Sequence, residues 1–512
     1  MTEMCEGVLP PAPENERKNE KKPLKIRIVL FFDGTLNNRI NIEEREKHEM
    51  GEASEAYSNF RTDDANSYDN GRTNIAIMEP HLSKEKEDYT GDYDLVYKHY
   101  IPGQGALTRQ KDSLWGYALA IGESGVPRRA EEGIKKAVAS IFDDKDNVNS
   151  EEHFVEKLSI DVFGFSRGAA TARYAIHVIF DGRISQIDEV TGEVYYEWRP
   201  ISQRLNNLGY EIDEKAVEVK FAGLYDTVLS YFGSQKIPWT ANALQQTAVA
   251  RAKKALHLAA ADEHRKDFPL HTIKSAVNAG VGEEYYLPGV HSDVGGSYNL
   301  ANEKMLEKET DEGKKTYMLS SDEGAEKPEF SWLGNAKGKT MVIHEGDTDR
   351  LKKDRQDLID QGWFKENEIT LHDMQWDDRG RATYSVLTVS RKNICSAYCN
   401  IPLKIMARYA RKPDVKLSID AKLEERANII LKSEEDLLKL EDKINLYIET
   451  NKNSTPEDWI GNKSLNKHPE IKEIRHRHFH FSASKWSAGY KPNFEWDKVA
   501  IQYRRRRYYY DA

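Results

Sequence analysis

The chain has 512 residues, of which 39% are hydrophobic and 31% charged, and its formal net charge is −10. These proportions are typical of a globular chain with one large domain and an accessory part, or with two domains. The basic residues are scattered along the chain, whereas a nucleic-acid-binding protein gathers them on one face. We therefore expect no nucleic-acid partner.

The cysteine content and the N-terminal segment set further limits. Cys5, Cys395 and Cys399 are the three cysteines and form no CxxC pair, so neither a disulfide framework nor a zinc site is predicted, and the last two are interpreted as buried thiols. Residues 1–24 are mostly polar, lack the apolar core of a signal peptide and are predicted to form a flexible N-terminal tail. We expect synthesis in the cytoplasm, and any export by a route that reads no signal peptide.

The first predicted elements alternate between strands and a helix. Lys25 to Phe32 (KIRIVLFF) is an apolar run that predicts a buried strand, and Asp33-Gly34-Thr35 supplies the turn after it. Residues 41–72 are polar without a useful period and are interpreted as a long loop or insertion. Leu95 to Ile101 predicts a second strand, and apolar residues at helical spacing after Pro127 predict a helix.

The alternation continues to about residue 300. Strands are predicted over Leu158 to Phe163, Ala216 to Tyr225 and Tyr285 to Val290, and helices over Ala169 to Phe180 and Ala255 to Asp262. Alternating helices and apolar strands favour a mostly parallel sheet that helices cover on both faces. Residues 25–300 are therefore predicted to form an α/β core.

The remainder of the chain differs in character. Residues 301–380 are polar and are predicted to form an irregular insertion. Residues 381–512 are predicted to form a C-terminal helical part that returns to the core, with helices over 419–431 and 437–448. Ser433 and Asp436 have the spacing of a capping box before the second helix.

One motif indicates nucleophilic chemistry. Gly164-Phe165-Ser166-Arg167-Gly168 fits G-x-S-x-G, in which two glycines permit a sharp strand-to-helix turn that presents the serine. Because the pattern lies between a predicted strand and a predicted helix, we interpret it as a nucleophile elbow of α/β-hydrolase type. The helix N-terminus would favour the negative charge that develops there.

A serine nucleophile needs a base and an orienting acid, which follow it in the order Ser, acid, His in this fold class. Asp226 ends a predicted strand, and His291 lies in a glycine-rich turn after another, so they are predicted to complete a triad with Ser166. Asp293 is the rival acid and is interpreted as a supporting carboxylate. His257 and His264 are the rival bases and are interpreted as structural.

An oxyanion needs two preorganised donors. The backbone N–H of Arg167 is predicted to be one, and the N–H of Gly34 or of Thr35 is predicted to be the other. The same turn, Phe31-Phe32-Asp33-Gly34-Thr35-Leu36, resembles the D-x-D-G-T-L of haloacid-dehalogenase phosphatases, but Phe31 stands where their nucleophilic Asp lies. Phosphatase chemistry is therefore not expected.

No cofactor and no essential metal are predicted. Serine chemistry needs no metal. The run that most resembles a ligand set is Asp262, Glu263 and His264, whose members are interpreted as groups at a helix end.

A series of motifs carries a resemblance to a known family. In order, VLFFDGTLNN, NGRTNI, YIPGQGA, GFSRGAATAR, FAGLYDTV, ALHLAAADEHRKDFP and YLPGVHSDVGGSY resemble the α/β-hydrolase family that includes the type VI secretion lipase effectors of Tle group one. They span residues 25–300, and CNIPLKIMARYA and RHRHFHFSASKW are more loosely similar to that group's C-terminal part. The family's triad falls on Ser166, Asp226 and His291.

The resemblance implies an A-type phospholipase that hydrolyses acyl esters of membrane phospholipids. It implies secretion by the type VI apparatus on a spike protein, action in the periplasm or membrane of the target cell, and a periplasmic immunity protein. Acyl position and head-group preference stay open. The alternatives are a serine hydrolase acting on another ester or thioester, and an inactive interaction protein with a hydrolase fold.

Overall fold

The computed structural model describes the chain between residues 21 and 510. Within that span it leaves undescribed residues 63–65, 90, 114–124, 183, 188–193, 198, 230–244, 299–305, 311–312, 318, 321–328, 331–335, 338–340, 347, 373–384, 392–393, 452–453, 460–467, 483–494, 498–501 and 505–508. The predicted tail, residues 1–24, lies outside the described residues up to position 20, and its last three residues already belong to the first strand.

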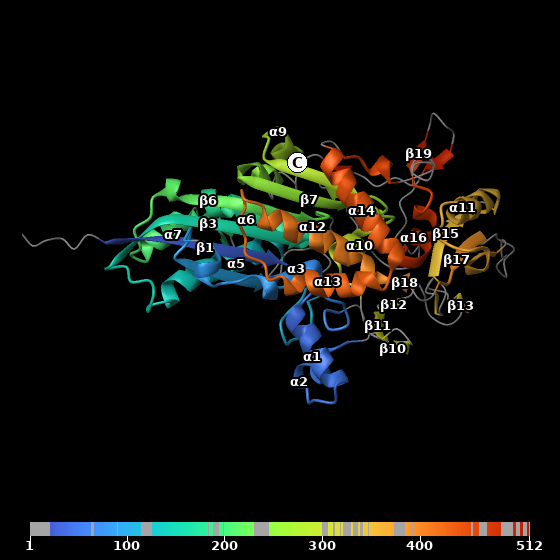
Figure 1. Cartoon of the computed structure of the whole chain (residues 1–512), viewed down its shortest axis with the longest axis horizontal. Helices are drawn as coiled ribbons and strands as arrows, with labels where there is room; N and C mark the ends of the chain where they lie inside the picture. The colour runs from blue at the N-terminus through green and yellow to red at the C-terminus, as the bar shows by residue number, and fades with distance from the viewer. Residues whose placement is uncertain are drawn as a thin grey trace, which may run out of the picture.

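A six-stranded sheet with only parallel pairings forms the centre of the molecule (Figure 1). Its spatial order is β2 (Leu95–Ile101), β1 (Lys22–Phe32), β3 (His153–Phe165), β6 (Val217–Tyr225), β7 (Lys254–Ala260) and β9 (Gly282–Leu287). The prediction of a mostly parallel α/β sheet is confirmed. The chain leaves β1 toward β2 and then crosses to β3 on the other side, so the carboxyl ends of β1 and β3 flank a switch point where ligands bind in such sheets.

The sheet is buried on both faces, which explains its nearly unbroken apolar strands. Along β1, Ile26, Ile28 and Leu30 belong to one core, which includes residues of α5 (Val126–Asp143) and α6 (Arg167–Asp181). The alternate residues Val29 and Phe31 belong to a second core on the opposite face. Because successive side chains point to opposite faces of the sheet, each strand contributes to two separate hydrophobic layers.

The C-terminal part supplies much of the cover on that second face. The second core includes residues of α3 (Asn74–Met78), α12 (Asn400–Arg411), α13 (Lys422–Lys432) and α14 (Glu435–Thr450). Helix α12 contacts β6, β7 and α3, and Figure 1 shows the helices of the C-terminal part beside the strands of the sheet. These helices are thus part of the main fold, not an appendage to it.

Residues 41–72 are not the long loop that the sequence predicts. They contain most of α1 (Arg39–Glu49) and all of α2 (Glu55–Phe60), which project from the sheet in Figure 1. Asn38 caps the first helix by accepting from the N–H of Ile40, and Ser54 caps the second. The helices lack a marked apolar stripe, so hydrophobic periodicity did not reveal them.

Residues 255–262 are also assigned differently. The sequence predicts a helix, but residues 254–260 form β7, which pairs with β6 and β9. Short apolar runs that are buried on both sides do not distinguish a helix from a central strand. The predicted capping box before α14 is wrong as well: the Ser433 hydroxyl donates to the carbonyl of Ile430 in α13, and Glu434 precedes α14 without a side-chain cap.

The interval 301–380, which we expected to be irregular, contains regular elements. They include α11 (Thr348–Asp360), β15 (Met341–Gly346) and β16 (Ile369–His372), and both strands pair antiparallel with β17 (Ser385–Val389), which lies just after the interval. The remaining helices and strands are α7 (Ile201–Asn207), α9 (Lys274–Asn278), α10 (His291–Gly295), α16 (Ile471–His478), β4 (Ile184–Ile187), β5 (Val194–Glu197), β8 (Leu270–His271), β10 (Leu306–Thr310), β11 (Gly313–Tyr317), β12 (Leu319–Ser320), β13 (Glu329–Phe330), β14 (Ala336–Lys337), β18 (Ile394–Cys395), β19 (Glu495–Asp497), β20 (Gln502–Arg504) and β21 (Tyr509–Tyr510). Within the described ranges, every helix is too short or too polar to cross a bilayer.

A buried ion pair joins the sheet to the C-terminal part. The Arg27 guanidinium on β1 binds the Asp161 carboxylate on β3 at 2.7 and 3.1 Å, and it also donates to the carbonyls of Val415 and Lys416. Both side chains of the pair are fully buried. The Arg27 guanidinium therefore balances the negative charge of the buried Asp161 carboxylate.

Replacing Arg27 with Met should lower the free energy of unfolding by about 3–5 kcal/mol, because it leaves a buried carboxylate without its cation. Adding Asp161→Leu should restore part of that loss, because it removes the unpaired carboxylate. The recovery should be incomplete, since the carbonyls of Val415 and Lys416 still lack a donor. Lys25→Met on the same strand is the control: its contact with Glu156 is exposed and 3.8 Å long, so the change should stay within about 1 kcal/mol. Urea unfolding measures all three, and an equal loss for Lys25→Met and Arg27→Met would contradict the assignment.

Candidate active site

Ser166 lies on a strained turn between β3 and α6. Its backbone angles are φ 60° and ψ −127°, a conformation that residues with side chains rarely adopt. A side chain at Gly164 would place its Cβ 2.5 Å from the Cα of Ala169, and one at Gly168 would lie 2.2 Å from the carbonyl oxygen of Asp33. Both glycines of the motif are therefore required by close backbone approach, and the predicted elbow is present.

The neighbouring strand helps to fix this turn. The N–H of Ser166 donates to the carbonyl of Tyr225 at 3.0 Å, and the carbonyl of Ser166 accepts from the N–H of Val228 at 3.3 Å. These bonds hold Ser166 beside the end of β6, where Asp226 follows Tyr225. Ser166 thus lies at the carboxyl edge of the sheet, next to the predicted acid.

Asp226 and His291 form a direct pair. The Nδ1 of His291 lies 2.5 Å from Oδ2 of Asp226, and Oδ1 of Asp226 accepts from the N–H of Ala260 at 2.8 Å. Both side chains are buried, and Asp226 has a positive φ of 40°. The carboxylate therefore fixes the orientation of the imidazole, as an orienting acid must.

Aromatic rings enclose the imidazole. The ring of Phe165 lies 4.5 Å from that of His291 between centroids, and the ring of Phe268 lies 5.0 Å away at a steep angle. Because Phe165 directly precedes Ser166, this contact brings the serine and the histidine to the same part of the sheet edge. Among the described residues, no hydrogen bond joins the Ser166 hydroxyl to His291; such bonds often form only with substrate bound.

Burial also shifts the pKa of His291. Desolvation lowers the pKa of His291 from its ordinary value of 6.5, while the hydrogen bond and the charge of Asp226 act in the opposite direction. An imidazole with a lowered pKa is neutral at pH 7 and can accept a proton. This is the protonation state that a general base requires.

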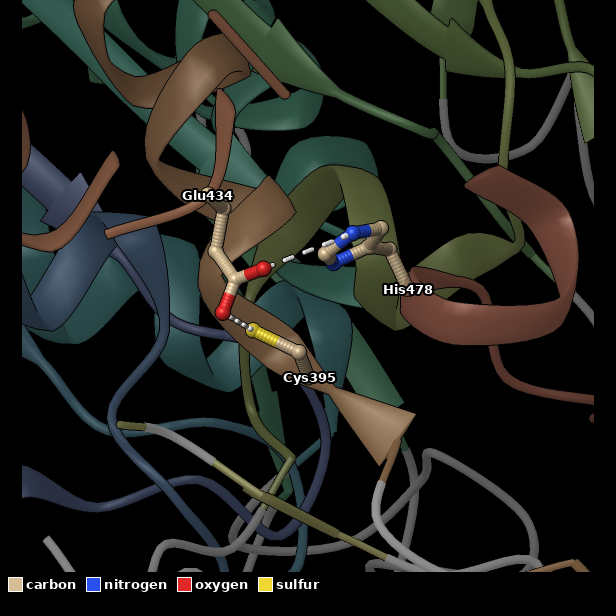
Figure 2. Close-up of side chains that lie close together, drawn as sticks. All are labelled: Cys395, Glu434 and His478. Atoms are coloured by element: carbon tan, nitrogen blue, oxygen red, sulfur yellow. Dashed lines mark hydrogen bonds and ion pairs between the residues drawn. The ribbon is translucent and has the colours of Figure 1, made fainter. Parts of the chain in front are cut away.

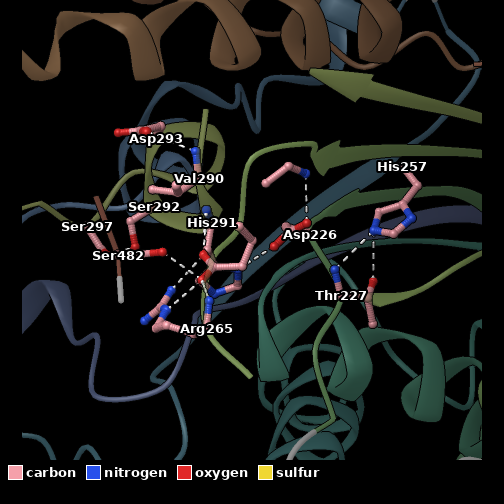
Figure 3. A network of polar contacts seen from close by, with 12 residues as sticks. Asp226, Thr227, His257, Arg265, Val290, His291, Ser292, Asp293, Ser297 and Ser482 are labelled. Atoms are coloured by element: carbon pink, nitrogen blue, oxygen red, sulfur yellow. Dashed lines mark hydrogen bonds and ion pairs between the residues drawn. The ribbon is translucent and has the colours of Figure 1, made fainter. Parts of the chain in front are cut away.

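Glu263 holds the backbone of the histidine turn, a role that sequence reasoning missed. Its Oε2 accepts from the N–H of His291 at 3.1 Å, and its carboxylate also binds the Arg265 guanidinium and the Ser482 hydroxyl. Figure 3 shows His291, Arg265 and Ser482 in the same part of this polar network. The chain places Glu263 three residues after the end of β7, at the same sheet edge. An acidic run after a strand was the available signal, and we attributed it to a helix end because β7 was predicted as a helix.

The other two members of that run have separate roles. Asp262 accepts from the N–H of Gly289 at 2.9 Å and pairs with Arg475, whereas the His264 ring stacks on that of Phe481 at 4.3 Å. In the part of the chain that the structure describes, Asp262, Glu263 and His264 do not form a group that could hold a metal ion.

The rival acid Asp293 pairs with a histidine other than His291. Its Oδ1 lies 2.7 Å from Nδ1 of His480, and its Oδ2 accepts from the N–H of Val290 at 2.9 Å. Burial raises the pKa of Asp293 well above its ordinary range. Asp293 thus holds the backbone of the turn that carries His291, in agreement with the supporting role predicted for it.

The rival base His257 is occupied by structural contacts. Its Nε2 accepts from the N–H of Thr227 at 3.0 Å, so its Nδ1 carries the proton that it shares with Glu284 at 2.8 Å. Thr227 directly follows Asp226. His257 therefore helps to hold the strained loop of the acid and lies on strand β7, not on a helix.

The turn after β1 contains Gly34 and Thr35, whose N–H groups the sequence predicts as alternative oxyanion donors. The N–H of Gly34 donates to the Asp33 carboxylate at 2.7 Å, which favours the Thr35 N–H for that predicted role. Thr73 and Tyr100 also donate to Asp33, and burial raises the pKa of this carboxyl to about 6. The Asp33 carboxylate therefore stabilises the turn through these three hydrogen bonds.

The sequence also contains an aromatic segment, 228–244, that could form an apolar rim or lid or belong to the core, and a basic run, 504–507, that could contact phosphates or be a solvated strand end. Both fall largely outside the described residues: segment 228–244 is described only at Val228 and Leu229, which are both buried. Of the basic run 504–507, only Arg504 is described, at the end of β20.

The parallel sheet, the serine elbow and the acid–histidine pair define an α/β protein of hydrolase type. The family model described as "T6SS, Phospholipase effector Tle1-like, catalytic domain" matches residues 26–321. The chain therefore belongs to the Tle1-like phospholipase effectors of the type VI secretion system. This confirms the resemblance found in the motifs.

One similar solved structure extends the likeness in fold over nearly the whole chain. A structure of "the Tle1 effector bound to the VgrG spike" from the type VI secretion system aligns with a TM-score of 0.54 at 18% identity, covering 98% of this chain and 94% of that one. An uncharacterized protein from Pseudomonas aeruginosa gives a TM-score of 0.40 at 17% identity, covering 86% of this chain and 52% of that one. No curated protein matches the chain.

The pKa of His291 should be measurable by NMR with histidine labelled at the ring carbons and the signal assigned by its loss in His291→Gln. We expect a value below 6.5, because burial disfavours the charged ring. Asp226→Asn should lower it further, since the carboxylate favours the charged form. A titration at or above 6.5 in the unmodified protein would contradict the geometry.

Proposed function

We propose that this chain is a serine phospholipase of A type, in which Ser166 is the nucleophile, His291 the general base and Asp226 the orienting acid. The observation that carries the proposal is the 2.5 Å contact between Asp226 and His291 at the sheet edge where the Ser166 elbow also lies. Membership of the Tle1-like phospholipase effectors supports a phospholipid substrate.

In this mechanism, Nε2 of His291 takes the Ser166 proton as Oγ attacks the acyl carbonyl carbon. The backbone N–H groups of Arg167 and Thr35 stabilise the oxyanion that forms, and α6 adds its dipole. His291 then gives the proton to the departing lysophospholipid oxygen. Water, deprotonated by the same imidazole, attacks the carbonyl carbon of the acyl-enzyme, and the imidazolium returns the proton to Oγ of Ser166 as the fatty acid leaves.

The proposed setting follows the neighbouring structure. The related Tle1 effector is bound to a VgrG spike in its solved structure, so we propose a spike protein as the carrier of this chain. We further propose action on membranes in the periplasm of a target bacterium, with a periplasmic immunity protein that protects the producer. A binding assay with a VgrG spike protein from the same organism tests the first of these.

Purified protein should release free fatty acid and a lysophospholipid from vesicles of phosphatidylethanolamine and phosphatidylglycerol. Ser166→Ala should abolish this release and also prevent labelling by a fluorophosphonate probe. Resolving the two lysophospholipid isomers assigns the acyl position. Turnover of short-chain esters or thioesters without any phospholipid hydrolysis would favour the other hydrolase, and no labelling at all would favour an inactive fold.

Asp226→Asn should lower kcat by roughly 10⁴ on a short-chain ester, because the imidazole loses its orienting carboxylate. His291→Ala should cost about as much, and combining the two should add little, since triad members act as a unit. Asp293→Asn is the matched control and should retain far more activity. If Asp293→Asn abolished turnover while Asp226→Asn did not, the assignment of the acid would be wrong.

A further inference from the structure

Three potential metal ligands meet in the C-terminal part, away from the Asp226 and His291 pair. Cys395 ends β18, Glu434 lies between α13 and α14, and His478 ends α16. Figure 2 shows the Glu434 carboxylate facing both the Cys395 sulfur and the His478 ring. We propose that these side chains bind a structural zinc ion.

The distances suit a tetrahedral ion after a small adjustment. The Cys395 Sγ lies 3.7 Å from Oε1 of Glu434. One ligand atom from each residue lies within 4.8 Å of the others. Zinc with bonds of about 2.0–2.3 Å places neighbouring ligand atoms about 3.3–3.8 Å apart, so the three groups need only a slight contraction.

His478 is arranged as metal-binding histidines commonly are. Its Nε2 lies 3.0 Å from Oδ2 of Asp436, whereas its Nδ1 is buried and has no hydrogen-bond partner among the described residues. A ligating histidine usually presents one nitrogen to the metal and the other to a carboxylate or carbonyl. A protonated His478 would instead bury an N–H that lacks an acceptor.

The local charge also fits a divalent cation. Cys395, Glu434 and His478 are all buried, and zinc would bind Cys395 as a thiolate, whose proton is released to solvent. The thiolate, Glu434 and Asp436 then carry three negative charges, and Arg477, which contacts both carboxylates, contributes one positive charge. A doubly charged ion neutralises the remainder.

The position of the ion explains what it would stabilise. His478 is two residues before His480, which binds Asp293, and Asp293 accepts from the N–H of Val290 beside His291. A zinc ion that joins β18, the α13–α14 junction and α16 would therefore anchor the segment that supports the histidine turn. The ion takes no part in bond cleavage, so the expectation of metal-independent chemistry is unchanged.

The test uses the full-length protein expressed with zinc and purified under reducing conditions. Elemental analysis should find about one zinc per chain, as for a closed structural site. Replacing the metal with Co²⁺ should give the near-ultraviolet absorption of a thiolate–cobalt bond. Thermal unfolding should occur at a lower temperature once a strong chelator has removed the ion.

Cys395→Ser should lose the cobalt–thiolate band, and His478→Gln should lose most of the bound zinc. Cys399→Ser is the matched control, since Cys399 is also buried but lies outside the cluster, and it should keep both. Should His478→Gln fail to fold, Glu434→Gln serves as the second ligand variant. Absence of zinc and of a cobalt band in the unmodified protein, or a band that survives Cys395→Ser, would overturn the proposal, and none of these readouts depends on phospholipase activity.

Discussion

The close approach of β3, β1 and α6 at the serine elbow is the constraint on which the site depends. Ser166 holds a positive φ, a conformation that costs on the order of 1–3 kcal/mol and persists only where the surroundings enforce it. Here the enforcement comes from Gly164 and Gly168, whose missing side chains let the helix backbone contact the strand ends. Hydrogen bonds to Tyr225 and Val228 then fix the turn from the neighbouring strand.

The histidine turn depends on a different set of forces. Glu263 and Asp293 hold its backbone from two sides, and each is satisfied by groups from the C-terminal part, Ser482 and His480 respectively. Buried carboxylates are costly unless they are hydrogen-bonded. The C-terminal segment that follows α16 is therefore needed to make the turn carrying His291 stable, although it lies almost 200 residues away in sequence.

Several buried carboxylates crowd this edge, and each has its own partner. Asp226 faces His291, Glu263 faces Arg265, Asp262 faces Arg475 and Asp293 faces His480. Because each carboxylate has a different partner, their roles differ. Of these four carboxylates, Asp226 is the one that contacts the imidazole near Ser166. The sequence window with Asp262, Glu263, His264, His291 and Asp293 thus contains one member of the acid–base pair, His291, and several supports.

The sequence by itself determined the parallel α/β core and the serine elbow, because strand periodicity and tight turns are encoded by neighbouring residues. It misassigned β7, which is a strand because it pairs with β6 and β9, and it missed α1 and α2, which lack a marked apolar stripe. Only the tertiary structure decided that His291 faces Asp226 and not Asp293, that His257 supports the acid loop, and that Cys395, Glu434 and His478 meet. These contacts join residues far apart along the chain. The pattern of neighbouring residues does not indicate which distant side chains will pack together.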